Sequence, residues 1–344
     1  MGVKNGLRRG AALAIALITT GALVTACGSS DDSANSTTKA TAENPVGCQT
    51  DGQTGNRVIK DTFYGDVTIP AQPKRIVSGW LLGTQFIDLN VRPVGMLDDY
   101  KKNATTEELS EVQGIPDVGS IQTGFNAEEV ISLKPDVIIT AVRPDMVEDL
   151  HMDQLKEIAP VVAFPIQEPT DVWSVYPKLA AALGCGDSAQ KQLDQLNTDL
   201  GQIATDNKDA EAKLGSVAYV EGSEQPATYQ IATNKSLSYD RITKAGLKYF
   251  DGVPADPKRY VELVSTEDIA RLSSANVLFF EADENGKPTK RTQALLDQEA
   301  FKNLPAVKAG NLFPYRLPYA YTVGAAKDQI DDIKAAVEKA KPAQ

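Results

Sequence analysis

The sequence predicts an α/β protein of two similar lobes joined by a long helical connector. The first sign is an internal repeat, because 126–139 and 265–279 each hold a cap residue, a short helix, a turn and a continuous apolar strand. The second sign is a helical stretch between the two copies. The copies lie about 140 residues apart in a body of about 290 residues, a length that suits two lobes or one large domain. The doubled unit favours two lobes, and chance recurrence of a common unit is the alternative.

Each copy of the repeat opens with a residue that caps helices well, Asn126 or Ser265. An acidic residue follows three positions later, Glu129 or Asp268. This is the spacing of a capping box, or close to it, and it indicates the start of a helix. The apolar run after each helix is typical of a strand buried in a parallel sheet.

The connector is predicted at 172–212 and contains two helices. The first covers 172–183 and ends at Gly184, and the second runs from 187 or 188 to about 207. A helix of about twenty residues spans ~30 Å, which is the width of a lobe. No Gly/Ser-rich linker interrupts it, so we expect a stiff joint. The apolar residues of the second helix fall on one face: Leu193, Leu196, Leu200 and Ile203.

The N-terminus reads as an export signal that ends at a cysteine. A basic start precedes an apolar run over 11–22, which is shorter than the ~20 residues needed to cross a bilayer. The small residues that lead directly into Cys27 resemble the lipobox of a bacterial lipoprotein, whose cysteine carries lipid, palmitate included. We therefore expect an exported protein held by lipid at the extracytoplasmic face of the cell membrane. The alternative is an ordinary signal that happens to contain a cysteine.

Composition sets the remaining boundaries and excludes one class of partner. Loss of the signal removes three positive charges and moves the formal net charge from −11 to −14, so nucleic acid is a poor partner. The polar segment before the body cannot bury enough surface to fold, which indicates a flexible tether. We expect these segments: signal peptide 1–26, lipid-anchored tether 27–56, N-terminal lobe 57–171, helical connector 172–212 and C-terminal lobe 213–344.

Two cysteines remain after lipidation, Cys48 and Cys185. Outside the cytoplasm such a pair favours a disulfide, and two separate buried thiols are the alternative. The single histidine, His151, is interpreted as a solvated helix residue. A bare transition metal needs several nitrogen, sulfur or oxygen ligands, so we expect no direct metal site, and any iron should arrive inside a chelator.

Several segments, in order, resemble the family of periplasmic (class III) iron-siderophore substrate-binding lipoproteins of ABC importers. They are 66–77, 91–95, 115–119, 129–139 and 301–313, with the helical connector in its expected place. The resemblance covers nearly all of the chain from about Arg57 to Val337. It implies two Rossmann-like lobes with parallel-rich sheets and one long interdomain helix. It also implies a ferric siderophore held between the lobes and delivered to an ABC permease and its ATPase.

Candidate ligand-binding residues come from the positions that follow predicted strands. In open α/β sheets, ligands sit beyond the carboxyl ends of the strands. Aromatic faces and cations suit a large, often anionic ferric chelate. The cluster 316–321 is the strongest candidate, and Arg259 and Lys235 are weaker ones. The full set is Trp80, Tyr100, Lys101, Arg143, Tyr229, Arg316, Tyr319 and Tyr321.

Each of these residues also has a structural alternative. Tyr100 and Lys101 are then surface loop residues, and Trp80 plugs the top of the first sheet. Arg143 and Arg316 are then members of structural salt bridges. The sequence alone leaves both interpretations open.

Docking to a permease is less clear, because transport members of the family carry a Thr-Glu pair where this chain has Thr84 and Gln85. Asp240 is the corresponding candidate on the second lobe. A heme- or corrinoid-binding protein that uses Tyr319 or Tyr321, or a cell-envelope scaffold, are the alternative functions. No nucleophile elbow, phosphate loop or dinucleotide fingerprint is present, so we expect no enzyme. We also expect a monomer without a cofactor of its own.

Overall fold

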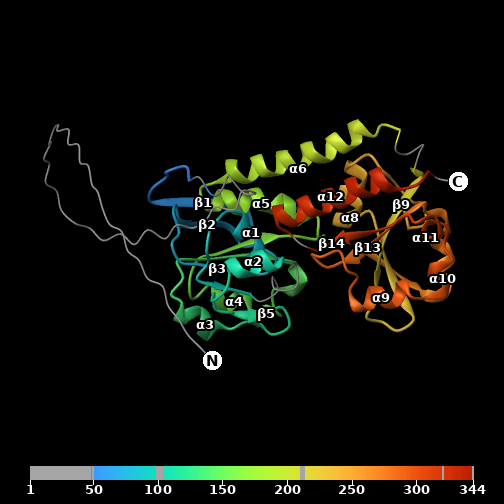
Figure 1. The fold of residues 1–344 in the computed structure, drawn as a ribbon. Coiled ribbons are helices and arrows are strands. Elements are labelled where there is room, and N and C mark those ends of the chain that lie inside the picture. The colour runs from blue at the N-terminus through green and yellow to red at the C-terminus, as the bar shows by residue number, and fades with distance from the viewer. Residues whose placement is uncertain (1–47, 49, 98–103, 210–213, 320, 343–344) are drawn as a thin grey trace, which may run out of the picture. The chain divides into compact units, whose positions relative to one another are not determined.

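The computed structural model describes residues 48, 50–97, 104–209, 214–319 and 321–342 (Figure 1). All of them belong to one compact unit, 41–344. The signal peptide, Cys27, most of the expected tether, Tyr100 and Lys101 lie outside the described residues. None of the helices in the described part of the chain is both long and apolar enough to cross a bilayer.

The N-terminal lobe contains a four-stranded parallel sheet in the order β4-β3-β7-β8. Its strands are β3 (Ile76–Ser78), β4 (Gly95–Met96), β7 (Val137–Val142) and β8 (Val161–Pro165). Every residue of β7 is buried, which explains its uninterrupted apolar sequence.

Short helices and small hairpins surround this sheet. The hairpin β1 (Asn56–Thr62) and β2 (Gly65–Pro70) precedes it, and β5 (Gly119–Ser120) pairs with β6 (Gly124–Phe125). The helices are α1 (Gly83–Asp88), α2 (Thr106–Glu111), α3 (Ala127–Ser132), the 3₁₀ turn η2 (Pro144–Met146) and α4 (Met152–Leu155).

The C-terminal lobe contains a separate mixed sheet in the order β12-β10-β9-β13-β14, with β11 also paired to β9. Strands β9, β11, β13 and β14 run parallel, whereas β10 pairs antiparallel with both of its neighbours, β9 and β12. The strands are β9 (Ser216–Gly222), β10 (Thr228–Ala232), β11 (Lys248–Tyr249), β12 (Val261–Ser265), β13 (Val277–Ala282) and β14 (Leu312–Arg316).

Helices again flank this second sheet. They are α8 (Leu237–Lys244), the 3₁₀ segment η3 (Thr266–Ser274), α9 (Lys290–Leu296), α10 (Glu299–Lys302), α11 (Pro305–Ala309) and α12 (Val323–Lys339). Two separate sheets confirm the prediction of two α/β lobes.

The internal repeat corresponds to matching units, α3–β7 and η3–β13. Asn126 accepts hydrogen bonds from the backbone of Glu128 and Glu129, and Ser265 accepts one from Glu267. Both predicted caps are confirmed. The second helix differs from the first, because η3 is a 3₁₀ segment and Asp268 has a non-helical backbone. The expected capping-box spacing from Ser265 to Asp268 therefore does not lead into an α-helix.

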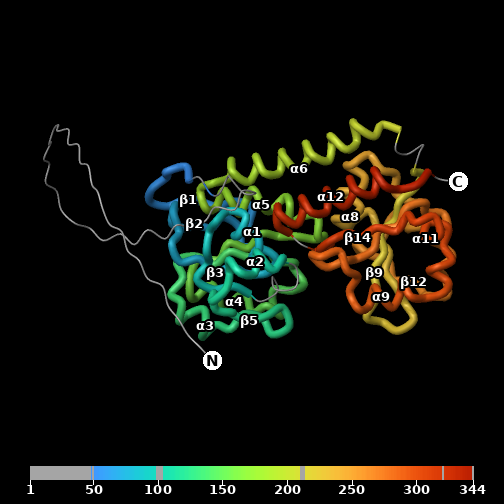
Figure 2. The backbone as a smooth tube through the Cα atoms, viewed as in Figure 1, coloured from blue at the N-terminus to red at the C-terminus, as the bar shows by residue number. Residues whose placement is uncertain are grey.

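The connector consists of two helices, α5 (Asp171–Ala182) and α6 (Gly186–Asp206). Figure 2 traces α6 as one continuous helix. Gly184 separates the two with a left-handed backbone (φ +82°), where a side chain would be strained. Helix α6 packs against α5 as well as against α8 and α12 of the C-terminal lobe. One helix therefore contacts elements of both lobes, as predicted.

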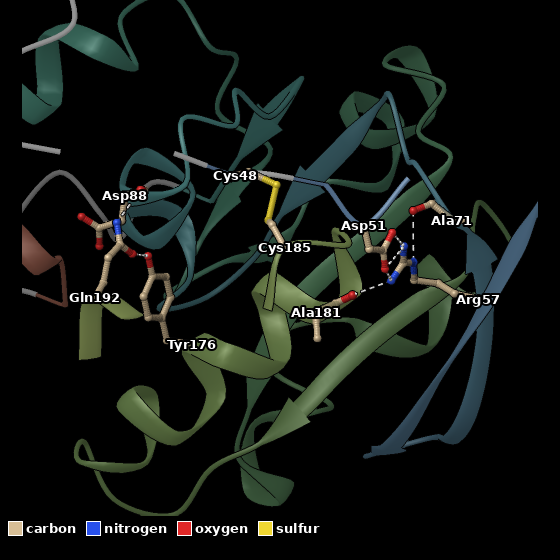
Figure 3. The surroundings of a disulfide bond; sticks show 9 residues. All are labelled: Cys48, Asp51, Arg57, Ala71, Asp88, Tyr176, Ala181, Cys185 and Gln192. Atoms are coloured by element: carbon tan, nitrogen blue, oxygen red, sulfur yellow. Dashed lines mark hydrogen bonds and ion pairs between the residues drawn. A yellow bond between two sulfur atoms is a disulfide. The ribbon is translucent and has the colours of Figure 1, made fainter. Parts of the chain in front are cut away.

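The start of the described chain is fastened to the turn between α5 and α6 (Figure 3). Cys48 forms a disulfide with Cys185. The guanidinium of Arg57 donates to the carboxylate of Asp51 and to the carbonyl of Ala181. The expected tether boundary at residue 56 is therefore wrong, because packing against the body already begins at Cys48.

A buried polar group joins the lobes behind the sheets. The carboxylate of Asp88, at the end of α1, accepts the backbone N–H of Val323 at the start of α12 (2.8 Å). Gln192 of α6 donates to the backbone carbonyl of Asp88 and accepts from the Tyr176 hydroxyl (Figure 3). Burial raises the pKa of Asp88 well above its usual value, and the hydrogen bond from Val323 opposes that shift. These contacts belong to the surface where the N-terminal and C-terminal lobes meet, which we call the seam.

Candidate functional site

On the N-terminal lobe, a tryptophan and an arginine meet at the carboxyl ends of adjacent strands. Trp80 lies just after β3 and Arg143 directly after β7, and these strands are parallel neighbours. The Arg143 Cζ atom lies 5.9 Å from the centre of the Trp80 ring, within cation–π range. Arg143 also donates two hydrogen bonds to Asp145 (both 3.1 Å), and both side chains are exposed. An exposed ion pair is weak, so Arg143 can exchange partners.

On the C-terminal lobe, two tyrosines hold one buried carboxylate. Tyr319, just after β14, donates its hydroxyl to Glu221 (2.6 Å), and Tyr219 donates to the other carboxylate oxygen (2.7 Å). Tyr260 packs edge-on against Tyr319, with ring centres 6.0 Å apart. Burial raises the pKa of Glu221 to about 7, although the two tyrosine hydrogen bonds oppose that shift.

The two halves of the site belong to different lobes. Burial raises the pKa of Tyr260 and the Glu221 charge raises it further, whereas the positive charges of Arg259 and Arg143 oppose both. Trp80 and Arg143 are not among the residues that line the small cavity at this place. Its lining comes from Pro169 of the N-terminal lobe and from Tyr219, Ala232, Ser236, Leu237, Ser238, Tyr260, Val261, Pro318 and Tyr319 of the C-terminal lobe.

The seam is nearly shut in this conformation. The cavity volume is about 10 Å³, room for about one water molecule, whereas pockets for larger ligands measure about 300–1,000 Å³. An ion pair between Lys235 and Glu168 (2.9 Å) crosses the seam, as do hydrogen bonds from Thr106 to Glu284. A large ligand therefore requires the seam to widen, and these exposed or half-buried contacts are the ones to break.

Three of the predicted ligand residues are placed elsewhere. Tyr229 is fully buried, because β10 is antiparallel and pairs within the sheet, and its hydroxyl donates to the carbonyl of Asp268 (3.3 Å). A ring without exposed surface cannot contact a ligand, so that prediction is wrong. Tyr321 is buried, at 7% exposure, and so is Trp80, at 8%, although Trp80 contacts the exposed Arg143 at the strand ends.

Arg316 is held by α12 and takes the structural role named as its alternative. Its guanidinium donates to Asp332 (2.8 Å) and Asp328 (3.1 Å), and its backbone N–H donates to Asp332 as well. Because two carboxylates pair with this guanidinium, its positive charge is balanced within the protein. Within the expected cluster 316–321, Tyr319 is the predicted residue that reaches the cavity.

The two predicted docking residues differ in exposure. Gln85 is fully buried, and its amide donates to the carbonyl of Val172 (3.3 Å). A permease cannot contact it without unfolding the helix, so the docking role of Gln85 is wrong. Asp240 is exposed and pairs with Lys244 (2.8 Å), so its role stays a prediction.

A second Trp–Arg contact lies outside the set of residues predicted from the sequence. Arg241 on α8 is 5% exposed, and its Cζ atom lies 5.1 Å from the centre of the Trp173 ring on α5. Burial lowers the pKa of Arg241, and the neighbouring Tyr315, Asp240 and Tyr321 oppose that shift. One signal was available, because Arg241 shares a helical face with the apolar Leu237.

Bare metal ions lack a site in the described part of the chain, where no group of three His, Cys, Asp or Glu side chains could hold one. His151 lies at the start of α4 with a left-handed backbone (φ 56°) and an exposed side chain. The seam instead offers aromatic rings, guanidinium groups and hydroxyls, which suit a preformed chelate.

Comparisons with known proteins agree with this geometry. Residues 94–317 match the periplasmic binding protein family. A Bacillus subtilis protein named as a probable siderophore-binding lipoprotein, YfiY, is 27% identical over 93% of this chain and 95% of its own. The iron(3+)-hydroxamate-binding protein YxeB of Bacillus subtilis is 26% identical over 78% of this chain and 81% of its own.

A solved structure extends the comparison to the fold. The siderophore periplasmic binding protein from the fuscachelin gene cluster of Thermobifida fusca is 27% identical, with a TM-score of 0.71 over 78% of this chain and 98% of that one. The match covers both lobes and the connecting helix described above. The chain therefore belongs to the periplasmic binding protein family and is a binding protein for transport, not an enzyme.

Proposed function

We propose that this protein captures a ferric siderophore between its lobes and delivers it to an ABC importer. The observation that carries the proposal is the presence of an aromatic and polar cluster on each lobe, Trp80 with Arg143 on one and Tyr260 with Tyr319 on the other. Aromatic faces and a guanidinium that can change partners suit a bulky, flat-sided chelate. The named ligands of YfiY, YxeB and the Thermobifida fusca protein support the same ligand class.

Binding then couples to opening of the seam. Because the cavity holds about one water, the chelate enters as the lobes or their rim loops separate and the Lys235–Glu168 ion pair breaks. Arg143 exchanges Asp145 for chelate oxygens at little cost, since both partners are exposed. The permease and its ATPase receive the loaded monomer, with Asp240 as a candidate contact.

Fluorescence titration tests the ligand claim. The purified full-length mature protein is titrated with ferrichrome, ferric aerobactin and ferric enterobactin while tryptophan emission is followed. We expect saturable quenching by at least one chelate, and replacement of Trp80 or Tyr319 by Ala should weaken it. Hemin is the control, and a Soret shift without any response to ferric chelates would contradict the proposal.

The same proposal includes anchoring by lipid on Cys27 at the extracytoplasmic face of the membrane. It rests on the small residues before Cys27 and on the lipoprotein naming of YfiY. The Cys48–Cys185 disulfide suits an oxidising compartment. Cells fed labelled palmitate should yield labelled protein, and Cys27→Ala should abolish the label. Label that persists in this variant would contradict the anchor.

A further inference from the structure

Arg241 is unlike the other basic residues of the structure, because it is buried without a carboxylate. It is the only basic side chain among the buried residues that the structure describes. Its neighbour Asp240 pairs with Lys244 instead. The terminal nitrogen Nη1 of Arg241 has no hydrogen-bond partner, and neither has the buried indole nitrogen of Trp173.

An unpaired buried cation is costly. Arginine stays protonated in proteins, so it cannot escape burial by losing its charge. Removing an ion from water costs several kcal/mol unless an opposite charge or hydrogen bonds offset it. Stacking on Trp173 supplies part of that compensation but leaves Nη1 without a hydrogen-bond partner. The contact therefore provides two free donors and an uncompensated positive charge at one place.

This place lies one helical turn behind the cavity in the seam. Leu237 and Ser238 line the cavity, and Arg241 follows them at i+4 and i+3 on the same face of α8. Across the seam, Pro169 lines the cavity and Trp173 follows it four residues later. On each side of the seam, a residue that lines the cavity is therefore followed about one helical turn later by a member of the Arg241–Trp173 contact.

We propose that Arg241 and Trp173 form the deep end of the ligand site, where their free N–H groups receive a carboxylate of the chelate. The inference rests on the proposed function and narrows the ligand class to siderophores that carry free carboxylates. A neutral trihydroxamate has no group to neutralise Arg241. Arg143 does not make this distinction, because Asp145 already balances its charge.

The test compares two hydroxamate chelates, ferric aerobactin, which carries free carboxylates, and ferrichrome, which carries none. Affinities are measured by calorimetry for the full-length mature protein and for Arg241→Gln, Arg241→Lys and Trp173→Phe. Arg75→Gln is the matched control, because it removes the same charge from an exposed residue just before β3, at the opposite end of that strand from Trp80. Melting temperatures are recorded for every variant without ligand.

We expect Arg241→Gln to weaken ferric aerobactin binding by about 10–100-fold, the loss of a hydrogen-bonded charge, and ferrichrome binding by less than about threefold. Arg241→Lys should bind ferric aerobactin with an affinity between those of the wild type and Arg241→Gln, and Arg75→Gln should change both affinities little. Unliganded Arg241→Gln should melt at or above the wild-type temperature, because the buried charge is gone. A purely structural role for Arg241 would lower it.

The outcomes separate this inference from the proposed function. If the wild type binds chelates but Arg241→Gln weakens both alike or neither, the inference fails and the proposed function stands. If the wild type binds no ferric chelate, the proposed function fails first. Inorganic phosphate is titrated into Trp80→Phe, whose remaining tryptophan is Trp173. A phosphate response there, with unchanged aerobactin affinity in Arg241→Gln, would assign the site to a free anion and overturn the inference.

Discussion

The chain has two tryptophans, and each stacks with an arginine at the seam, yet the two contacts differ in kind. Trp80–Arg143 lies at the strand ends of the N-terminal lobe, where Arg143 is exposed and already balanced by Asp145. Trp173–Arg241 is buried between α5 and α8, and its cation has no carboxylate. In the Trp80–Arg143 contact, the arginine can therefore exchange its partner Asp145 for a ligand. In the Trp173–Arg241 contact, the arginine has a positive charge that only an external anion can balance.

The largest effect on this difference is expected from a substitution that places a carboxylate beside Arg241. Ser238 lies one turn before Arg241 on the same buried face of α8. Ser238→Asp places an acid at i−3, where it can pair with Arg241 and also favours the helix N-terminus. We expect roughly 100-fold weaker binding of ferric aerobactin and an unfolding free energy higher by about 1 kcal/mol.

Ser238→Asn is the matched control, because it has the same shape without the charge. It should leave the preference for carboxylate-bearing chelates intact. Calorimetry gives the affinities and urea denaturation gives the stabilities. Equal losses in the Asp and Asn variants would mean that crowding of the cavity, not neutralisation of Arg241, caused the effect.

A second comparison sets these arginines against Glu221, a buried acid. Burial raises the pKa of Glu221 to about 7, above its ordinary value of 4.5, although Tyr319 and Tyr219 donate to it. Between these pH values the folded state binds the proton more tightly than the unfolded state. Stability should therefore fall as pH rises from about 4.5 to about 7, by on the order of 3 kcal/mol, and stay level above that.

Glu221→Gln isolates this contribution, since other buried acids such as Asp88 also titrate. The variant keeps acceptor and shape but cannot ionise, so its stability should lose this part of the pH dependence. Urea denaturation at several pH values measures the difference between the two proteins. Identical pH profiles would show that Glu221 ionises normally in the folded protein. The nearby Glu281 and Arg291 should be kept unchanged in the same experiment.

The same contrast explains what the sequence could predict. Trp80 and Arg143 follow apolar runs that form adjacent parallel strands, so the rule of strand ends locates both. Tyr229 lies within the antiparallel strand β10, whose direction local alternation does not reveal. The carboxylates that bind Arg316 belong to α12, twelve and sixteen residues later, so the sequence left its two roles open.

Arg241 was missed for a related physical reason. Its partner Trp173 is distant in sequence, and the adjacent Asp240 makes the segment look like an ordinary solvated helix. Burial of Arg241 is a tertiary fact that depends on how α5 meets α8. The local sequence pattern therefore predicts the contact that contains the exposed Arg143. The buried contact between Arg241 and Trp173 depends on how the lobes pack against each other.

The smallest expected effect concerns the rim. Arg143→Gln removes a cation that Asp145 already balances, so its unfolding free energy should change by less than about 0.5 kcal/mol. Affinities for ferric aerobactin and ferrichrome should fall together, by roughly 3–10-fold, because a rim guanidinium contacts any chelate oxygen without reading its charge. The association rate should lose part of its salt dependence, which stopped-flow fluorescence measures. If this variant lost affinity for ferric aerobactin but not for ferrichrome, Arg143 rather than Arg241 would be the residue that recognises the carboxylate of the chelate. Arg241 would then have the role of the general contact.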